Sequence, residues 1–338
     1  MKLYGGIDLH SNNCVVVLLD EEDHVVYEKR LSNDLGYLLL ELAPYQGMIE
    51  GVVVESTFNW YWLVDGLMEA GYPVHLANTG AIVQYAGLKY TDDRSDARWL
   101  AHLLRLRLLP EGYIYLEEER AVRDLLRKRS QLVRQKVTHI LSIQNLMSRN
   151  KGMRLSADKI RQLSDAEVEG LLPQADLARA VKSNLAVYRC LVEEIDGLEK
   201  VVKRRVKLRP NFRHLLTVDG IGSILGMTIM LETGDIGRFE RVGQFASYCR
   251  CVDSHKISNG KRKGSGNTKN GNNYLAWAFI EAANFAIRYN PKVKRFYQRK
   301  KDKTNGMVAL KAVAHKLARA CYYILRDQEP FQVEKAFG

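Results

Sequence analysis

The spacing of apolar and polar residues predicts alternating strands and helices in the first hundred residues. Short runs rich in β-branched residues favour strands, and apolar residues three or four positions apart favour helices. The predicted strands cover residues 2–8, 14–19, 25–31, 52–55 and 73–77. The predicted helices cover residues 35–42 and 59–70, and a third begins near Asp93. Three successive strands, followed by alternating helices and strands, predict an α/β domain.

Two long helices are predicted in the middle of the chain. Apolar residues recur with steps of three, four or seven between residues 120 and 148, and again between 181 and 202. This spacing is typical of amphipathic helices, and Gly152 and Pro173 separate the two patterns. We therefore expect an antiparallel helical hairpin. Its narrow apolar stripe favours a coiled-coil seam with a partner, although a hairpin that packs only on itself fits the same pattern.

The composition changes after Pro210 to glycine-rich turns and basic runs. Residues 254–280 contain no acid, four Gly and five Asn, and we expect a basic flexible loop there within a mainly α-helical region. The order of elements in the first region is that of a ribonuclease-H-like or RuvC-like fold, which by itself says nothing of function. The predicted domains are a RuvC-like domain at 1–112, a helical coiled-coil domain at 113–209 and a C-terminal domain at 210–330.

Composition and charge restrict the class of protein. The 338 residues are 46% hydrophobic, which excludes a disordered chain, and no apolar run reaches the roughly 20 residues that cross a bilayer. An acid at position 8 argues against a signal peptide, and five scattered cysteines fit reduced thiols in a cytoplasm. The net charge is +12, with basic clusters at 203–213, 256–269 and 292–303. These clusters favour a nucleic-acid partner over a merely solvated surface.

Four acids are candidates for chemistry. Asp8 and Glu55 each end a predicted strand, and Asp93 and Asp96 are three residues apart at a predicted helix start, where they share one face. Taken singly, each acid is more often structural, and an Asp at a helix start is commonly an N-cap. Together they supply the oxygen ligands that one or two Mg²⁺ ions need. Such a cluster is typical of phosphoryl transfer.

Several motifs resemble one known family. They are Gly6-Ile7-Asp8, Val54-Glu55-Ser56-Thr57, Asp93-Arg94-Ser95-Asp96-Ala97 and Val218-Asp219-Gly220-Ile221-Gly222. In this order and spacing, the chain resembles the DEDD-type insertion-sequence transposases over nearly its whole length. These enzymes are bridge-RNA-guided recombinases, and Piv-like DNA invertases are their relatives. The resemblance implies a RuvC-like domain, a coiled coil and a C-terminal transposase domain, in the order predicted above.

The resemblance also implies site residues. Asp8, Glu55, Asp93 and Asp96 correspond to the four metal-binding acids, and Asp92 lies outside the pattern. The family has a serine nucleophile after a segment that Gln244–Asp253 matches, and the same interval leads to Ser258. The segment departs from the family at Arg250-Cys251 and Asp253, so Ser254 and Ser265 are alternatives. From the residues alone, a Ser before Asn-Gly is first of all a turn residue.

The residues from Val218 to Gly222 also look like a helix-hairpin-helix turn. In such a turn the glycines allow backbone N–H groups to approach a phosphate, whereas a plain helix–helix turn makes no DNA contact. Asp219 departs from the Pro that relatives usually have, and a carboxylate there repels phosphate unless it caps the following helix. The predicted nucleic-acid-binding residues are Gly220, Gly222, Lys256, Lys261, Arg262, Lys263, Lys269, Arg295, Arg299 and Lys300.

The resemblance implies a Mg²⁺-dependent DNA recombinase that pairs donor and target DNA through a structured non-coding guide RNA. Ser258 forms a phosphoserine intermediate in this interpretation, and the protein is a homo-oligomer, either a dimer or a tetramer. Three alternatives remain open at this stage. They are a Piv-like site-specific invertase, a RuvC-like junction nuclease that uses water and no guide RNA, and a nucleic-acid-binding protein without catalysis.

Overall fold

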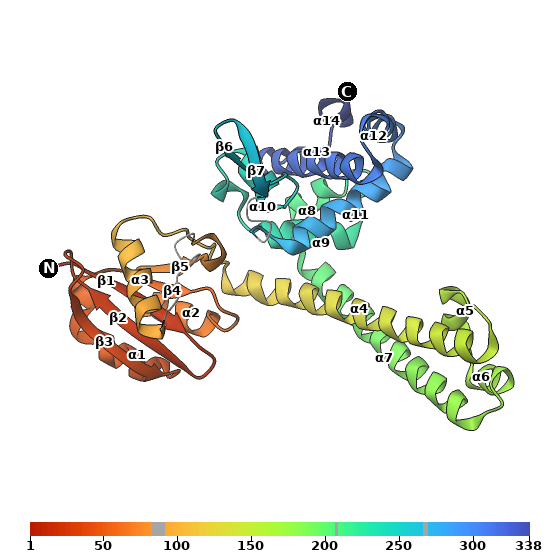
Figure 1. Cartoon of the computed structure of the whole chain (residues 1–338), viewed down its shortest axis with the longest axis horizontal. Helices are drawn as coiled ribbons and strands as arrows, with labels where there is room; N and C mark the ends of the chain where they lie inside the picture. Colours follow the sequence, from red (N-terminus) through yellow and green to blue (C-terminus); the bar gives the residue numbers. More distant parts are fainter. Residues whose placement is uncertain (83–91, 207–208, 266–269) are drawn as a thin grey trace. The chain divides into compact units, whose positions relative to one another are not determined.

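The chain forms two compact units in a computed structural model that describes residues 1–82, 92–206, 209–265 and 270–338 (Figure 1). The first unit is Met1–Glu117 and the second is Glu118–Gly338. The first holds a mixed β-sheet with helices. The second holds two long helices and the helical C-terminal region.

The first unit contains a five-stranded sheet in the order β3-β2-β1-β4-β5. Its strands are β1 (Leu3–Leu9), β2 (Asn13–Leu19), β3 (Val25–Ser32), β4 (Ile49–Glu55) and β5 (Val74–Ala77). The first three form an antiparallel meander, and β4 and β5 run parallel to β1 and β4, respectively. This topology confirms the predicted ribonuclease-H-like α/β fold.

Helices cover both faces of this sheet. The helices are α1 (Leu35–Leu42), α2 (Tyr61–Glu69) and α3 (Asp93–Arg105), with short 3₁₀ turns η1 (Ala43–Met48) and η2 (Thr79–Ala81). Because side chains alternate along a strand, Ile7 of β1 packs with α1 and α2, whereas Val53 of β4 packs with Leu100 of α3. Asp8 and Glu55 therefore belong to the face that α3 covers.

A glycine lets α3 lie directly on β1. A Cβ atom added to Gly6 would be 2.0 Å from the carbonyl oxygen of Ala97 and 2.8 Å from the backbone nitrogen of Ala101. Any side chain at position 6 would therefore push the helix away from the sheet. This close approach brings the first turn of α3 beside the end of β1, where Asp8 lies.

Two long helices form an antiparallel arm in the second unit (Figure 1). They are α4 (Glu117–Lys151) and α7 (Ala175–Val206), and they confirm the predicted helical hairpin. Two short helices that were not predicted, α5 (Ala157–Gln162) and α6 (Asp165–Leu171), connect them and share an apolar core with them. Ser164 begins α6 with a capping box to Glu167, a local signal that explains this helix.

The C-terminal region is mainly helical, as predicted. Its helices are α8 (Pro210–Leu215), α9 (Ser223–Thr233), α10 (Val242–Tyr248), α11 (Asn273–Tyr289), α12 (Pro291–Lys303), α13 (Gly306–Asp327) and α14 (Val333–Phe337), with a 3₁₀ turn η4 (Ile236–Arg238). Phe245, Phe279 and Leu317 are fully buried in the common core. Among the described residues, no helix is both long and apolar enough to cross a bilayer.

The prediction of a flexible loop at residues 254–280 is wrong for much of this segment. Strands β6 (His255–Ser258) and β7 (Lys261–Ser265) form an antiparallel hairpin, and α11 already begins at Asn273. The turn residues Asn259 and Gly260 have φ angles of 49° and 70°. Positive φ at both positions characterises the type I′ turn, which Asn-Gly strongly favours between two strands. The basic, glycine-rich composition concealed this local signal.

Candidate functional site

Asp8 lies one residue before the end of β1, and Glu55 ends the neighbouring parallel strand β4. The register pairs Ile7 of β1 with Val54 of β4, which brings the next residue of each strand side by side at the same edge. Asp8 is only 3% exposed. Burial, a hydrogen bond with Asp8 and the charges of Asp8 and Asp96 raise the pKa of Glu55 to about 8. Two carboxyl groups this close either share a proton or bind a cation.

Asp93 and Asp96 lie in the first turn of α3, and neither of them caps the helix. The N-cap is Asp92, whose side chain accepts a hydrogen bond from the backbone of Ser95 at 2.7 Å. Burial raises the pKa of Asp96, and the charges of Asp8 and Asp93 add to this effect. The N-cap role that the sequence allowed for Asp93 or Asp96 thus belongs to Asp92. The other two acids of the turn are available to the site.

Two basic residues that the sequence analysis did not assign complete this cluster. The Nε2 atom of His10 lies 3.3 Å from a carboxylate oxygen of Asp8 and 3.3 Å from one of Asp93. Arg30 of β3 donates to the same oxygen of Asp93 at 2.5 Å, and this bond holds the pKa of Asp93 below its usual value. Nothing in the local sequence around Arg30 indicates that it contacts an acid 63 positions later.

The loop that carries His10 is held in place by three hydrogen bonds. The backbone oxygen of His10 accepts from the side chains of Asn33 and Asn59 at 3.0 and 2.9 Å, and its N–H donates to Asn13 at 2.9 Å. The two Asn side chains come from segments that follow β3 and β4. This arrangement fixes the backbone of His10 and so positions its ring between Asp8 and Asp93.

The donor atoms fit a divalent metal. One atom each from Asp8, His10 and Asp93 lies within 4.8 Å of the others, the one such group of three found in the part of the chain that the structure describes. The Nε2 atom of His10 is buried and makes no hydrogen bond of good geometry with any described residue. Carboxylate oxygens are the ligands that Mg²⁺ prefers, and imidazole suits several other divalent ions.

We expect Mg²⁺ to raise the unfolding temperature of the protein at pH 8 and to have little effect at pH 5. Between about pH 4.5 and 8 the folded chain keeps the proton on Glu55 while the unfolded chain releases it. The metal-free fold therefore loses stability as the pH rises through this window. A bound cation removes this loss because it stabilises the carboxylate. Thermal unfolding with and without Mg²⁺ at both pH values measures the effect.

Glu55→Gln should abolish most of this Mg²⁺-dependent increase at pH 8. Glu50→Gln is the matched control, because Glu50 lies at the other end of the same strand, is exposed and pairs with Lys2. An equal Mg²⁺ effect in Glu55→Gln and in the unchanged protein would contradict a metal site at this sheet edge.

Ser258 ends strand β6 in the second unit and is exposed. Its backbone pairs with Lys261 across the hairpin turn, and the exposed Lys261 and Lys263 lie on the opposite strand. Lys256 and Arg262 belong to the two strands of the same hairpin, whereas Lys269 lies outside the described residues. The alternatives Ser254 and Ser265 lie before β6 and at the end of β7. The hairpin thus presents Ser258 within a basic segment.

The residues that precede and follow this hairpin are hydrogen-bonded to each other at its base, which we call the root of the hairpin. The guanidinium of Arg250 donates to the backbone oxygen of Gly271 at 3.0 and 3.2 Å and to the side chain of Asn273 at 2.6 Å. The backbone N–H of Asn272 donates to the carbonyl of Tyr248 at 2.6 Å. These bonds fix where the hairpin leaves the helical core.

A buried charge network links this root to the arm. Glu232 of α9 is 2% exposed and accepts two hydrogen bonds from Arg127 of α4, at 2.6 and 2.7 Å. The side chain of Asn272 donates to the same carboxylate at 2.8 Å, and the Arg127 guanidinium lies 4.6 Å from the ring centre of Tyr274. Removing one partner of such a pair leaves a buried charge without compensation. Arm helix α4 and the base of the serine hairpin are therefore connected.

The helix-hairpin-helix-like turn joins α8 and α9. Gly220 has a φ of 95°, and an added Cβ would be 2.4 Å from the carbonyl oxygen of Ala282 in α11. Packing against α11 therefore requires a glycine there. Asp219 does not cap α9 but accepts a hydrogen bond from Asn290 at 2.6 Å. Gly222 precedes the first turn of α9, and a Cβ there would meet no described atom within 4 Å.

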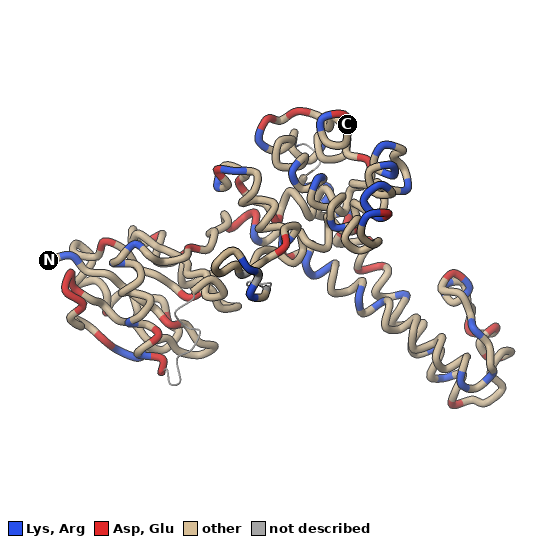
Figure 2. Tube along the Cα trace, turned by 45° about the horizontal axis from the view of Figure 1, so that its top comes forward, with Lys and Arg blue, Asp and Glu red and all other residues tan. Residues whose placement is uncertain are grey.

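Helix α12 presents a basic face. Asn290 caps it, Val293 is buried against the core, and Arg295 and Arg299 are exposed, whereas Lys300 is half-buried. Figure 2 shows Lys and Arg gathered on this helix near the C-terminus. Within the described ranges, the ion pair recorded for this helix joins Lys292 to Glu334 of α14. Most cations of α12 therefore remain available to an external anion.

Comparison with known proteins gives matches at both ends of the chain. Residues 5–150 match a family model of DEDD transposases of the IS110 type, and residues 212–298 match the model of the transposase IS116/IS110/IS902 family. The transposase for insertion sequence element IS1111A of Coxiella burnetii is 21% identical over 336 residues, which are 97% of this chain and 90% of the relative. The transposase for insertion sequence element IS1328 of Yersinia enterocolitica is 22% identical, with coverages of 94% and 95%.

A putative transposase, y4qE, of Sinorhizobium fredii is 26% identical over 77% of this chain and 65% of its own length. The two family models fall on the segments that carry the four acids and the serine hairpin. A DEDD domain of this kind implies a divalent metal and phosphoryl transfer on DNA. Because both models and relatives that span nearly the whole chain agree, the chain belongs to the IS110/IS116/IS902 family of transposases.

Proposed function

We propose that this transposase exchanges DNA strands through a covalent bond between Ser258 and DNA, with Mg²⁺ held by Asp8, Glu55, Asp93 and Asp96. The observation that carries the proposal is the convergence of these four acids. They come from two parallel strands and the first turn of α3, and at this edge of the sheet burial and the charges of neighbouring acids raise the pKa of Glu55 and of Asp96. Such mutual repulsion is costly unless a cation is bound.

A bound Mg²⁺ supplies positive charge that neutralises the scissile phosphate and stabilises the leaving oxygen. The chain's own residues hold the ligands in position. His10 lies 3.3 Å from both Asp8 and Asp93, and the hydrogen bonds from Asn33 and Asn59 keep its loop in place. Arg30 holds Asp93 ionised, as a metal ligand must be.

Ser258 attacks phosphorus in the proposed chemical step. A new bond forms between its Oγ and the phosphorus as the bond from phosphorus to one deoxyribose oxygen breaks. The serine proton passes to solvent, and the released deoxyribose oxygen takes a proton from solvent to become a hydroxyl. The reverse attack, by a hydroxyl of a different strand, releases Ser258 and joins the new strand, so no external energy source is required. The register that pairs Lys261 with Ser258 supports a phosphate contact by Lys261, and we propose the same contact for Lys263 on the same strand.

The proposed partners are donor DNA, target DNA and a structured guide RNA. The resemblance to bridge-RNA-guided enzymes, the net charge of +12 and the basic faces of the hairpin and α12 support this part of the proposal. We propose phosphate contacts for Lys256, Lys261, Arg262, Lys263 and Lys269 in or near the hairpin, for Arg295, Arg299 and Lys300 on α12, and for the N–H groups at Gly220 and Gly222.

We also propose a homo-oligomer, a dimer or a tetramer, with sites that combine acids and serine from different subunits. The proposed domains are 1–112, 113–209 and 210–330, so the acids and Ser258 belong to different domains. Val137, Leu141 and Val187 on the arm are 44 to 51% exposed, which leaves apolar surface for a second copy to cover. Mass measurement of the protein with nucleic acid tests this part, and a strict monomer on DNA would contradict it.

The experiment that tests the proposal is a strand-exchange assay with purified protein, donor and target DNA, Mg²⁺ and the RNA transcribed beside the gene. We expect recombinant product only when RNA and Mg²⁺ are both present. Equal recombination without RNA would favour a Piv-like invertase. Hydrolysed DNA ends without joined product would favour a RuvC-like nuclease, and binding without any cleavage would overturn an enzymatic role.

A further inference from the structure

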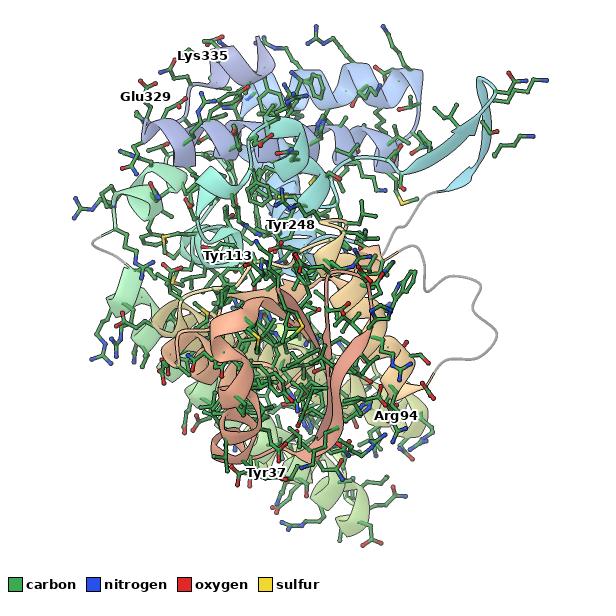
Figure 3. The ribbon with its side chains drawn as sticks, turned by 90° about the vertical axis from the view of Figure 1, so that its left-hand side faces the viewer. Tyr37, Arg94, Tyr113, Tyr248, Glu329 and Lys335 are labelled. Carbon is green, nitrogen blue, oxygen red and sulfur yellow. The ribbon has the colours of Figure 1, made fainter. Side chains whose placement is uncertain are left out.

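An open cleft of about 410 Å³ lies between helix α13 and the C-terminal segment 329–336. One side is the last three turns of α13, and the other is the segment that leads into α14. Figure 3 labels Glu329 and Lys335, which both line this cleft. The cleft lies beyond residue 298, where the family match ends, and it belongs to none of the basic clusters discussed above. Its volume is in the range of small-ligand sites.

The charged groups of the cleft leave a net positive charge. The side chains of Arg319 and Lys335 make no hydrogen bond or ion pair with any described residue, although the charge of Lys335 acts on Asp327 across the cleft, so both side chains can contact an anion. Asp327 is neutralised by two hydrogen bonds from Arg326, at 2.6 and 3.1 Å. The remaining acid, Glu329, is exposed. Two free cations in an open cleft favour an anionic ligand.

The uncharged lining suits a flat ring. Tyr323 is 41% exposed, and the guanidinium of Arg326 lies 4.9 Å from its ring centre, which holds the ring in place. Ile324 and Phe331 add apolar surface. An exposed aromatic ring beside free cations is the combination with which proteins bind unpaired nucleotides, because the base stacks while the cations contact the phosphate.

We propose that this cleft binds one unpaired nucleotide of the nucleic acid that the transposase handles. The base stacks on Tyr323, the phosphate contacts Arg319 and Lys335, and Glu329 accepts a hydrogen bond from an exocyclic amino group. This inference rests on the proposed nucleic-acid binding. It adds a site that recognises a bulged or looped nucleotide, which the RNA or a distorted DNA supplies.

The test uses the full-length protein and a hairpin with a single bulged 2-aminopurine, made once as RNA and once as DNA. Stacking quenches 2-aminopurine fluorescence, so we expect quenching on binding that Tyr323→Leu removes. Tyr323→Leu and Arg319→Ala should each weaken binding of the bulged probe about tenfold, consistent with one lost stacking or phosphate contact. Arg319→Ala should also lower the slope of affinity against salt by about 0.7.

Two controls keep this proposal separate from the proposed function. Lys2→Ala also removes one positive charge, from an exposed pair with Glu50, and should leave bulge binding unchanged. A fully paired duplex should bind the cleft variants as it binds the unchanged protein. Unaltered bulge binding and quenching in both cleft variants would overturn the proposed cleft site while leaving nucleic-acid binding intact. Preference for the RNA or the DNA probe identifies the source of the nucleotide.

Discussion

Asp8→Asn and Asp96→Asn are each expected to abolish strand exchange and to leave binding of DNA and RNA unchanged. Both side chains belong to the acid cluster at the end of β1, whose proposed role is to hold Mg²⁺. Removing one charged ligand costs several kcal/mol of transition-state stabilisation, which corresponds to a loss of roughly a thousandfold or more. Strand-exchange rates and affinities, measured in parallel with Mg²⁺, test this expectation.

Asp92→Asn is the matched control for these variants. It changes a neighbouring acid in the same way, but Asn caps a helix as well as Asp does, so α3 should keep its start. We expect near-normal activity from Asp92→Asn. Near-normal recombination by both Asp8→Asn and Asp96→Asn would refute the metal-site proposal. Loss of folding in these two variants, seen by circular dichroism, would mean that the acids are structural.

Ser258→Ala is expected to bind nucleic acid normally but to form neither a covalent protein–DNA adduct nor a recombinant product. Ser258 is exposed, and the hairpin is held by backbone pairing and the Asn259-Gly260 turn, so the loss of one hydroxyl should not unfold it. Ser258→Cys should keep a trace of adduct formation, because a thiolate is a competent nucleophile. Denaturing gels of protein with labelled DNA measure the adduct.

Peptide mapping of the trapped conjugate decides between the candidate serines. Ser254→Ala and Ser265→Ala are matched controls, because they remove the same hydroxyl before β6 and at the end of β7. DNA attached to Ser254 or Ser265 would show that the nucleophile lies elsewhere in the same segment. Cleavage by Ser258→Ala at the normal rate would show that water attacks.

Some of this protein's structure follows from local sequence. Short apolar runs such as Val52–Glu55 determine strands, and the parallel neighbours β1 and β4 then place Asp8 and Glu55 at one edge. The long 3.6-residue pattern determines the arm helices. A local signal was also present for the β6–β7 hairpin in Asn259-Gly260, but the surrounding basic, glycine-rich composition favoured a flexible loop.

Other features depend on contacts between residues far apart in sequence. Three acids stand within the five residues from Asp92 to Asp96. Asp92 caps the helix through a local hydrogen bond from Ser95, whereas the packing of α3 on Gly6 brings the first turn of the helix beside Asp8. Arg30 and His10 join the site through Asp93, and Arg127 joins the serine hairpin through Glu232.

Amino-acid sequence by itself determined the elements and the types of residue available for chemistry, because strand and helix periodicity and turn preferences act over a few residues. The tertiary structure alone decided which of these residues contact one another. Gly220 was predicted as a phosphate-binding glycine, and the structure adds a second requirement for glycine there, the close approach of α11, whose Ala282 lies 62 positions further along the chain. Such close approaches and buried charge pairs arise only when separate elements pack, since their energies depend on distance and burial that no local pattern encodes.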